Sequence, residues 1–246
     1  MKLQGKVALI TGAASGLGAA TARLFAVQGA KLLLLDRNQE LLQKLAEEIK
    51  GSAFVCDITN EQQVEEIISA EKQKIAVCVN CAGIAPAGRI LSREGPMPMA
   101  DFTKAITVNL LGSFNVLRLV AEQMSREPEQ GGVIINTASV AAYDGQLGQA
   151  AYSASKGAIA SLTLPAAREL ARFGIRVVAI APGIMNTPMM QGMPDKVQES
   201  LLQQITYPQR FGEAEEFAQL ALHIVENEYL NGTVIRLDAG IRMNSR

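Results

Sequence analysis

Near its amino terminus the chain reads Val7-Ala8-Leu9-Ile10-Thr11-Gly12-Ala13-Ala14-Ser15-Gly16-Leu17-Gly18 and continues as the helix-forming run Ala19–Phe25. A short apolar strand, a glycine-rich turn and a helix start follow one another in dinucleotide-binding sites. The glycines let the backbone approach a pyrophosphate, and the helix offers unpaired N–H groups and the positive end of its dipole. A glycine-rich turn alone could be a tight loop, so the prediction depends on its place between strand and helix. The residues assigned to this cofactor turn are Gly12, Ser15, Gly16, Leu17 and Gly18.

The same alternation of strand, turn and helix continues along the chain. The predicted strands are Val7–Thr11, Lys31–Asp36, Ala53–Cys56, Ile75–Asn80, Val133–Thr137, Arg176–Ala181 and Thr233–Leu237. Helical periodicity marks Glu40–Lys50, Glu61–Glu71 and Phe102–Met124. Several strands are uninterrupted apolar runs, as expected when both faces of a parallel sheet are buried. The sequence therefore predicts an α/β protein: a single-domain Rossmann fold over residues 1–246, with a doubly wound, mostly parallel seven-stranded sheet and helices on both faces.

Composition and charge exclude several classes of function. The chain has 246 residues, 48% of them hydrophobic, which suffices for one large core without metal or disulfide staples. Its 23 Lys and Arg against 24 Asp and Glu leave no basic excess for nucleic acid. No stretch approaches a signal-peptide core or a membrane span, so we expect a cytoplasmic protein with no membrane partner.

Neither a metal site nor a disulfide is expected. Cys78 and Cys81 are three residues apart in a strand pattern and therefore point to opposite faces of the sheet. His223 is the only histidine, so a zinc site would lack ligands.

Acidic residues at the ends of the second and third strands bear on the choice of cofactor. Asp36 can accept hydrogen bonds from the adenosine ribose hydroxyls and would repel a 2′-phosphate, which favours NAD over NADP. Arg37 complicates this interpretation, because an arginine could serve a phosphate. Asp57 and Ile58 are placed to bracket the adenine, but Asp57 could equally cap the following helix.

A serine, a tyrosine and a lysine form the predicted catalytic group. Ser139 lies just past the end of the fifth strand, where ligands of open α/β sheets bind. Tyr152 and Lys156 are four residues apart and share one face of a helix. The lysine ammonium and the positive nicotinamide of the oxidised cofactor are both expected to favour the phenolate. Tyr152 then exchanges a proton with a hydroxyl while hydride moves, and Ser139 holds the substrate oxygen.

These features together resemble the short-chain dehydrogenase/reductase family over essentially the whole chain. The matching pieces are the glycine turn, Asn80-Cys81-Ala82-Gly83, Asn109, Ser139, Tyr152-x-x-x-Lys156 and Pro182-Gly183. The resemblance implies a catalytic tetrad of Asn109, Ser139, Tyr152 and Lys156, with Asn109 anchoring a water that links Lys156 to solvent. It also implies cofactor contacts from Asn80, Ala82, Gly83, Tyr152, Lys156, Pro182, Gly183 and Thr187. Thr187 could also be a helix N-cap before Pro188, and both roles can hold together.

Longer matches narrow the resemblance. Asn136–Ala142, Gly145–Gly157 and Leu230–Asp238 resemble the type II 3-hydroxyacyl-CoA dehydrogenases, whose reaction is the oxidation of 3-hydroxyacyl-CoA by NAD. We place a substrate lid at about 184–211, where flexible methionines suit an acyl chain, although an amphipathic helix pair explains the pattern equally well. Gln149 is a candidate contact to a substrate carbonyl beside Ser139 and Tyr152.

Other interpretations stay open. Arg89 and Arg93 could meet CoA phosphates or could simply be solvated. A 3-oxoacyl-carrier-protein reductase, which would normally prefer NADPH, and a short-chain alcohol or steroid dehydrogenase are rival functions. A non-catalytic scaffold or binding subunit is the alternative from another class. The family resemblance further implies a homotetramer built on Ala151–Leu170 and Phe102–Met124.

Overall fold

A single parallel sheet organises the computed structural model, which describes residues 1–127 and 131–245. Its seven strands lie in the order β11-β8-β7-β4-β1-β2-β3, and every adjacent pair is parallel. The strands are β1 Val7–Thr11, β2 Lys31–Asp36, β3 Ser52–Val55, β4 Ile75–Asn80, β7 Gly132–Thr137, β8 Ile175–Pro182 and β11 Val234–Leu237. The predicted fold is confirmed, and each predicted strand differs from the observed one by no more than one residue at either end.

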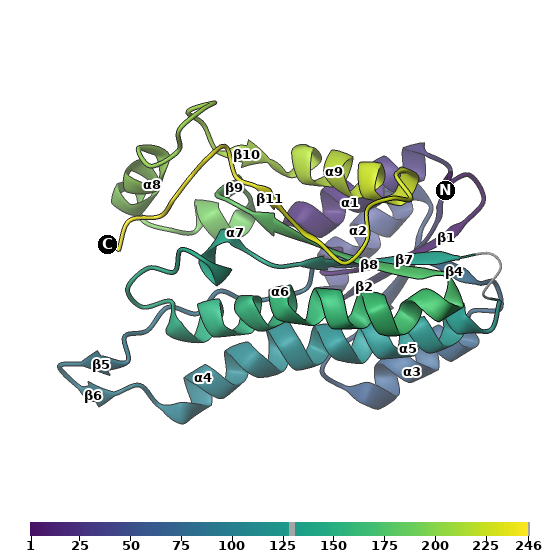
Figure 1. Ribbon diagram of the computed structural model, residues 1–246, viewed down its shortest axis with the longest axis horizontal. Coiled ribbons are helices and arrows are strands. Elements are labelled where there is room, and N and C mark those ends of the chain that lie inside the picture. The colour runs from purple at the N-terminus through teal and green to yellow at the C-terminus, as the bar shows by residue number, and fades with distance from the viewer. Residues whose placement is uncertain (128–130, 246) are drawn as a thin grey trace.

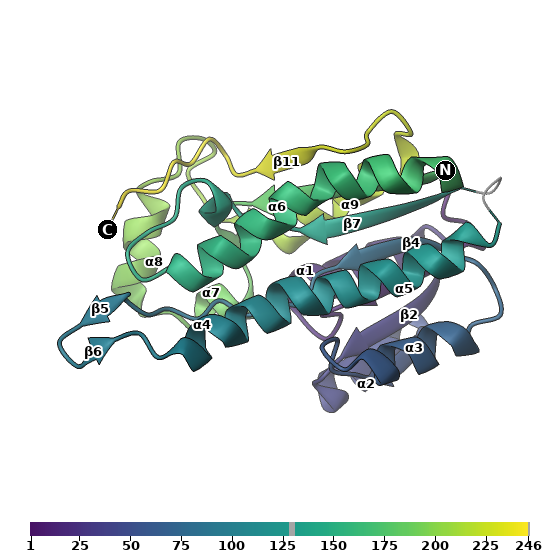
Figure 2. The same cartoon turned by 60° about the horizontal axis from the view of Figure 1, so that its bottom comes forward.

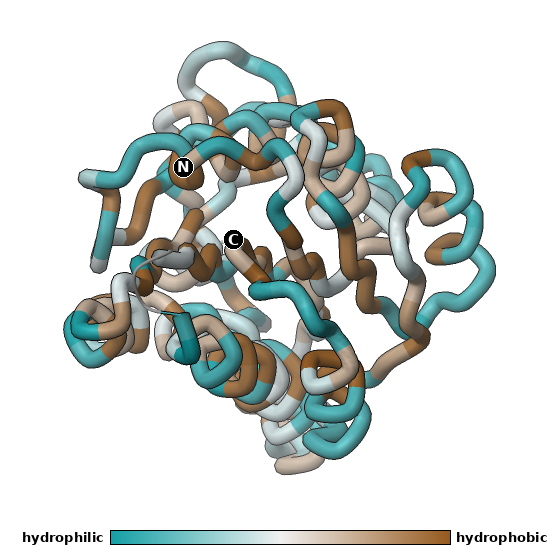
Figure 3. Tube along the Cα trace, turned by 90° about the vertical axis from the view of Figure 1, so that its right-hand side faces the viewer, coloured by the Kyte–Doolittle hydropathy of each residue, from teal (hydrophilic) through white to brown (hydrophobic). Residues whose placement is uncertain are grey.

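Helices cover both faces of this sheet (Figures 1 and 2). One face carries α1 Gly16–Val27, α2 Gln39–Ile49 and α9 Ala214–Glu226; the other carries α3 Glu61–Ala70, α5 Ser113–Ser125 and α6 Ala150–Leu170. Alternate residues of a strand face opposite sides, so Ala8 and Ile10 join one buried cluster while Val7 and Leu9 join the other. Apolar segments accordingly lie inside the molecule and polar ones outside (Figure 3).

The strand order reverses between β1 and β4, which opens a crevice at the carboxyl ends of these strands. The crevice brings the glycine turn against the Cys81-Ala82 turn. Cys81 N donates to Thr11 O at 3.2 Å, and Ala82 N donates to the Thr11 hydroxyl at 3.2 Å. A Cβ on Gly12, whose φ is +64°, would lie only 2.7 Å from Ala82 N. Gly12 is therefore required by backbone packing as well as by its left-handed conformation.

The predicted helix Phe102–Met124 is longer and less regular than expected. It begins as α4 Met99–Ile106, passes through a π-helical segment Thr107–Gly112 and continues as α5. By length and composition Met99–Ser125 could cross a membrane. Its apolar face is instead buried against the sheet, where Val116, Val120 and Met124 pack with Ile134. It is a core helix of this domain.

Smaller elements project beyond the carboxyl ends of the strands. They are the hairpin β5 Leu91–Ser92 and β6 Gly95–Pro96, the pair β9 Met185–Asn186 and β10 Gly212–Glu213, and the helices α7 Pro188–Gln191 and α8 Asp195–Leu202. Because β9 pairs with β10, the chain between them leaves and returns at one point of the fold.

Candidate active site

A cavity of about 700 Å³ opens along the carboxyl edge of the sheet. It extends from Asp36 and Asp57 past the glycine turn to Tyr152 and on to a wall of methionines. The predicted site residues on its lining are Gly12, Ser15, Gly16, Leu17, Gly18, Asp36, Asp57, Ile58, Ala82, Gly83, Ser139, Gln149, Tyr152, Lys156, Pro182, Gly183 and Thr187. Asn80 and Asn109 lie behind it. The structure thus gathers residues that are up to 175 positions apart in the sequence, Gly12 and Thr187, on one surface.

The glycine turn has the properties of an anion site. α1 begins at Gly16, and Ser15 occupies the N-cap with extended backbone but makes no side-chain capping bond. The first N–H groups of a helix have no partner within the helix, and no acidic residue occupies the first turn of α1. A Cβ on Gly18 would lie 2.2 Å from Gly12 O, so only glycine fits there. These donors and this close packing fit the pyrophosphate of a dinucleotide.

Asp36 connects the end of β2 to this turn. Its Oδ2 accepts a hydrogen bond from Ala14 N at 3.0 Å, and its Oδ1 accepts one from Asn38 N at 2.9 Å. Arg37 is turned toward Asp57, with 3.6 Å between Nε and Oδ2. The adenosine end of the cavity therefore presents the fixed carboxylate of Asp36. The neighbouring Arg37 guanidinium already faces another carboxylate, that of Asp57.

The helix-capping alternative for Asp57 is wrong. Asn60 caps α3, since its Oδ1 accepts from Gln63 N at 3.2 Å. Asp57 Oδ1 instead accepts from the backbone and hydroxyl of Thr59, at 3.0 and 2.8 Å. Asp57 closes a local turn at the rim of the cavity beside Ile58.

Asn80 supports the site from behind. Its side chain is 2% exposed, donates to Asn136 Oδ1 at 2.9 Å and accepts from the Thr11 hydroxyl at 3.4 Å. These bonds hold the amide across β1, β4 and β7, behind the cavity, and the cofactor contact of Asn80 stays a prediction.

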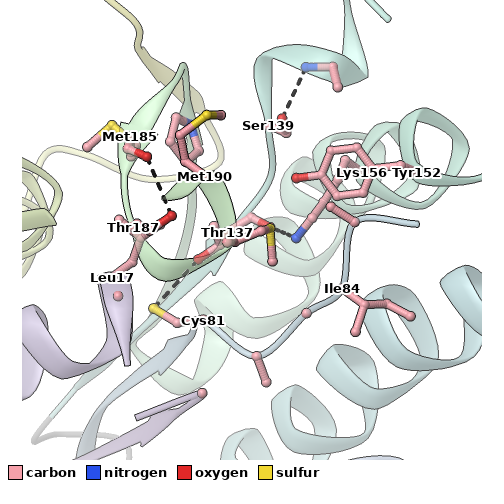
Figure 4. Close-up of a pocket in the computed structure, with 18 of the residues that line it drawn as sticks. Leu17, Cys81, Ile84, Thr137, Ser139, Tyr152, Lys156, Met185, Thr187 and Met190 are labelled. Atoms are coloured by element: carbon pink, nitrogen blue, oxygen red, sulfur yellow. Dashed lines mark hydrogen bonds between the residues drawn. The ribbon is translucent and has the colours of Figure 1, made fainter. Parts of the chain in front are cut away.

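Tyr152, Lys156 and Ser139 meet in the middle of the cavity (Figure 4). Lys156 Nζ lies 6.0 Å from the centroid of the Tyr152 ring and donates to Thr137 O at 2.7 Å. Ser139 Oγ accepts from Ala141 N at 3.1 Å, and its hydroxyl faces the Tyr152 phenol, so both hydroxyls converge on one point of the cavity. The three polar groups converge where the cofactor side and the apolar side of the cavity join.

Burial controls the ionisation of these groups. Desolvation raises the pKa of Tyr152 above its usual value, partly opposed by a hydrogen bond with Ser139. Desolvation lowers the pKa of Lys156 to about 8. The direction for Tyr152 comes from its apolar surroundings, and the expected help of Lys156 and of the oxidised nicotinamide to the phenolate stays a prediction.

Asn109 is fully buried in the π-helical segment and uses its side chain on protein groups. Its Oδ1 accepts from Ile84 N at 2.8 Å, and its Nδ2 donates to Ile84 O and to Ser155 Oγ, both at 2.9 Å. The amide therefore joins the turn after Gly83 to α6 one residue before Lys156. Its side chain is committed to these contacts and positions the site, and the role of Asn109 in anchoring a water stays a prediction.

The far side of the cavity is apolar. Gln149 lines it with its Oε1 bonded to Gln146 N at 2.9 Å. Thr187 occupies the N-cap position of α7 with Pro188 at the helix start, but its hydroxyl makes no capping bond and donates to Met185 O at 3.4 Å. The apolar wall is formed by Ala141, Leu147, Met189, Met190, Met193, Val197, Leu201 and Met243. Sequence reasoning missed Met243 and Leu147, which no motif connects to the lid segment.

Two other expectations concern metal and CoA. Within residues 1–127 and 131–245, no group of three or more His, Cys, Asp and Glu side chains could hold a metal ion. Cys78 is buried in one core cluster, whereas Cys81 packs on the other and lines the cavity. Arg89 and Arg93 are exposed near β5 and β6, outside the cavity lining.

Comparisons with known proteins agree with this geometry. Residues 12–242 match the family model described as enoyl-(acyl carrier protein) reductase. The chain is 50% identical to 3-hydroxyacyl-CoA dehydrogenase type-2 of Bos taurus, with 98% of this chain and 97% of the relative covered. A crystal structure of 3-hydroxyacyl-CoA dehydrogenase type-2 from Mycobacterium avium superimposes with a TM-score of 0.91 at 37% identity, covering 98% of each chain.

A second solved structure is a 7α-hydroxysteroid dehydrogenase in complex with NADH and 7-oxo glycochenodeoxycholic acid. It has a TM-score of 0.90 and 30% identity, with 100% of this chain and 97% of that chain covered. The sheet order, the glycine turn and the Ser139, Tyr152 and Lys156 cluster accompany full-length similarity to dehydrogenases. This chain belongs to the short-chain dehydrogenase/reductase family of oxidoreductases.

Proposed function

We propose that this chain is an NAD-dependent 3-hydroxyacyl-CoA dehydrogenase that interconverts 3-hydroxyacyl-CoA and 3-oxoacyl-CoA. One observation carries the proposal: a single cavity joins Asp36, the Tyr152 cluster and an apolar methionine wall. A nicotinamide dinucleotide and an acyl substrate would meet at Tyr152 in such a cavity. The name shared by the bovine and mycobacterial relatives supports the acyl-CoA substrate.

The choice of NAD depends on charge at the adenosine end. The Asp36 carboxylate is held by two backbone N–H groups and would repel a 2′-phosphate. Arg37, the residue that could attract such a phosphate, faces Asp57. The NADH in the solved 7α-hydroxysteroid dehydrogenase is consistent with this preference.

The residues of the cavity divide the chemical work. The bound cofactor supplies the hydride acceptor and, in its oxidised form, a positive charge that favours the Tyr152 phenolate. Tyr152 takes the proton of the substrate hydroxyl during oxidation and returns it during reduction. Ser139 donates its hydroxyl proton to the same substrate oxygen, whose charge develops in the transition state. Lys156 lies behind Tyr152, anchored on Thr137 O.

The segment 184–211 is proposed as the lid over the acyl chain. It contributes Met189, Met190 and Met193 to the cavity, and the β9–β10 pair closes its base. Unbranched, polarisable methionine side chains adapt to acyl chains of different shape. This supports the lid interpretation over a plain amphipathic helix pair.

We further propose a cytoplasmic homotetramer. Leu111, Phe114 and Leu164 are large apolar side chains exposed on the helices that the resemblance assigns to subunit contacts. Exposed apolar groups on neighbouring helices favour a protein partner.

The first experiment measures NADH formation at mildly alkaline pH with 3-hydroxybutyryl-CoA, with NAD and NADP in parallel. Turnover with NAD alone supports the proposal. Turnover mainly with NADP would favour the 3-oxoacyl-carrier-protein reductase alternative. A chain that binds NADH but shows no turnover of 3-hydroxybutyryl-CoA with either cofactor would reject this substrate and direct the search to secondary alcohols and steroids.

The matched variant Tyr152→Phe distinguishes an enzyme from a scaffold. It removes one hydroxyl and leaves the ring that packs in the cavity, so NADH binding should persist while turnover falls by roughly 10²-fold or more. Unchanged turnover in this variant would contradict the assignment of Tyr152 as the acid–base.

A further inference from the structure

The chain after β11 continues along the open end of the cavity and contributes to its wall. Residues 240–245 continue from the end of β11 toward α8 (Figure 1). Met243 lines the cavity, and Ile241 is fully buried. This segment, called here the tail, is therefore part of the substrate side of the site.

One guanidinium connects the tail to two other parts of the fold. Arg236 Nη2 pairs with Asp144 Oδ2 at 2.6 Å, and Arg236 Nε pairs with Asp238 Oδ2 at 2.6 Å. The same Nη2 donates to Ile241 O at 3.1 Å. The side chains of Arg236, Asp144 and Asp238 are 23%, 19% and 10% exposed, so solvent screens this network less than a surface pair. Arg236 thus connects β11, the tail and the loop that follows Ser139.

Further hydrogen bonds connect the tail to both walls of the cavity. Leu147 N donates to Ser245 O at 3.1 Å, which holds the tail against the loop of residues 143–149. On the other side, Asn244 N donates to Gln204 Oε1 at 2.7 Å. The Thr206 hydroxyl donates to Gly240 O at 3.2 Å. The tail therefore bridges the loop and the lid segment.

An apolar cluster lies beneath this bridge. Ile241 of the tail packs with Ile205 of the lid segment and with Val140, the residue next to Ser139. A displacement of the tail would therefore disturb the packing of the lid segment and of Val140, next to the serine that is proposed to hold the substrate oxygen.

We infer that the tail is a structural wall of the substrate site and that Arg236 is a positioning residue that sets the affinity for substrate through the loop 143–149 and the lid. This inference rests on the proposed function only for the choice of substrate in its test. The cofactor turn and Asp36 make no contact in this network. The cofactor residue Gly183 meets β11 only through its backbone, with Gly183 N bonded to Leu237 O at 2.9 Å, so the affinity for NAD should depend on Arg236 much less than the affinity for substrate.

The test compares Arg236→Gln, Asp144→Asn and the double variant with the wild-type chain. Arg23→Gln is the matched control, because it breaks another bidentate pair between separate elements, with Glu48, at an exposed place. Steady-state kinetics with 3-hydroxybutyryl-CoA give KM for each substrate and kcat. Hydrogen–deuterium exchange of the substrate-free proteins follows residues 143–149, 201–206 and 240–245.

The expected result for Arg236→Gln is a KM for the acyl substrate raised by roughly tenfold, with kcat and KM for NAD within about twofold of wild type. Exchange should accelerate in the tail, the loop and the lid segment together. The double variant should be no worse than Arg236→Gln alone, since both substitutions break the same pair. Arg23→Gln should change none of these quantities.

Two results would overturn the inference. One is an unchanged acyl KM with faster exchange confined to the tail, which would make the network merely local. The other is an equal loss for NAD and substrate, which would indicate general loosening. If the wild-type chain itself turns over no acyl-CoA, the proposed function fails, and the exchange pattern alone then decides whether Arg236 couples loop, tail and lid.

Discussion

Asp36 has two tasks that a single substitution should reveal together. Its carboxylate is expected to bind the adenosine ribose, and it also accepts a hydrogen bond from Ala14 N in the glycine turn. Replacing Asp36 with Ala should raise KM for NAD by roughly 10- to 100-fold and shift the NADP to NAD ratio of kcat/KM toward NADP. Glu40→Ala, an exposed acidic change at the start of α2, is the control. Unaltered NAD and NADP kinetics in the Asp36 variant would contradict the cofactor assignment.

Lys156 should give the free energy of unfolding a distinctive pH dependence. Its pKa is lowered by burial to about 8 in the folded chain, against 10.5 for an ordinary lysine. Between these values the unfolded chain binds a proton that the folded chain lacks, so the contribution of Lys156 to stability rises with pH. The full increase in the free energy of unfolding is about 3 kcal/mol at most. Below pH 8 the buried ammonium destabilises the folded chain.

Thermal unfolding at pH 7 to 10 tests this sign. The difference in Tm between wild type and Lys156→Met should narrow or reverse in favour of wild type as the pH rises, because the variant lacks the titrating group. Other groups titrate equally in both proteins and cancel in the difference. A difference that stays constant from pH 7 to 10 would show that Lys156 keeps an ordinary pKa.

Among the elements, the glycine turn makes the clearest steric demand. A Cβ on Gly18 would collide with Gly12 O at 2.2 Å, and this backbone oxygen cannot move aside as a flexible side chain could. Gly18→Ala should therefore weaken NADH binding by roughly 10²-fold or more, measured by fluorescence titration, because the turn must open. Gly157→Ala is the control: its nearest contact in α6 would be Ala142 O at 4.0 Å, so it should bind NADH normally and gain about 0.5 to 1 kcal/mol of stability.

What could be predicted from sequence follows the range of the interactions. The buried strands are apolar runs, so their bounds were predictable from local pattern, as were the glycine turn and the four-residue spacing of Tyr152 and Lys156. The π-helical segment was not, because Thr107–Gly112 carries no local signal that separates it from the α-helices on either side. The burial that raises the pKa of Tyr152 could not be predicted either, because sequence spacing does not give the apolar surroundings of the phenol.

Over the whole molecule, long-range contacts between polar residues escaped prediction altogether. Arg236 and Asp144 are 92 residues apart, and each is an ordinary charged residue in its local sequence. The same holds for Met243, which reaches the cavity only because the chain continues past β11 toward α8. Such contacts depend on the complete fold and have no local periodicity or turn signal.

The assembly is the last prediction at this scale. Phe114 on α5 is 43% exposed on the sheet face covered by α5 and α6, and Leu111 beside it is 53% exposed. If these side chains lie between subunits, Phe114→Glu would bury a charge without a partner and should dissociate the proposed tetramer into smaller species. Val27→Glu is the matched control, because Val27 is 80% exposed at the end of α1, on the opposite face. Sedimentation velocity should show a tetramer for wild type and Val27→Glu and a smaller species for Phe114→Glu. A wild-type chain that sediments only as a monomer at working concentration would reject the tetramer, and the exposed apolar residues of α5 would then need another partner.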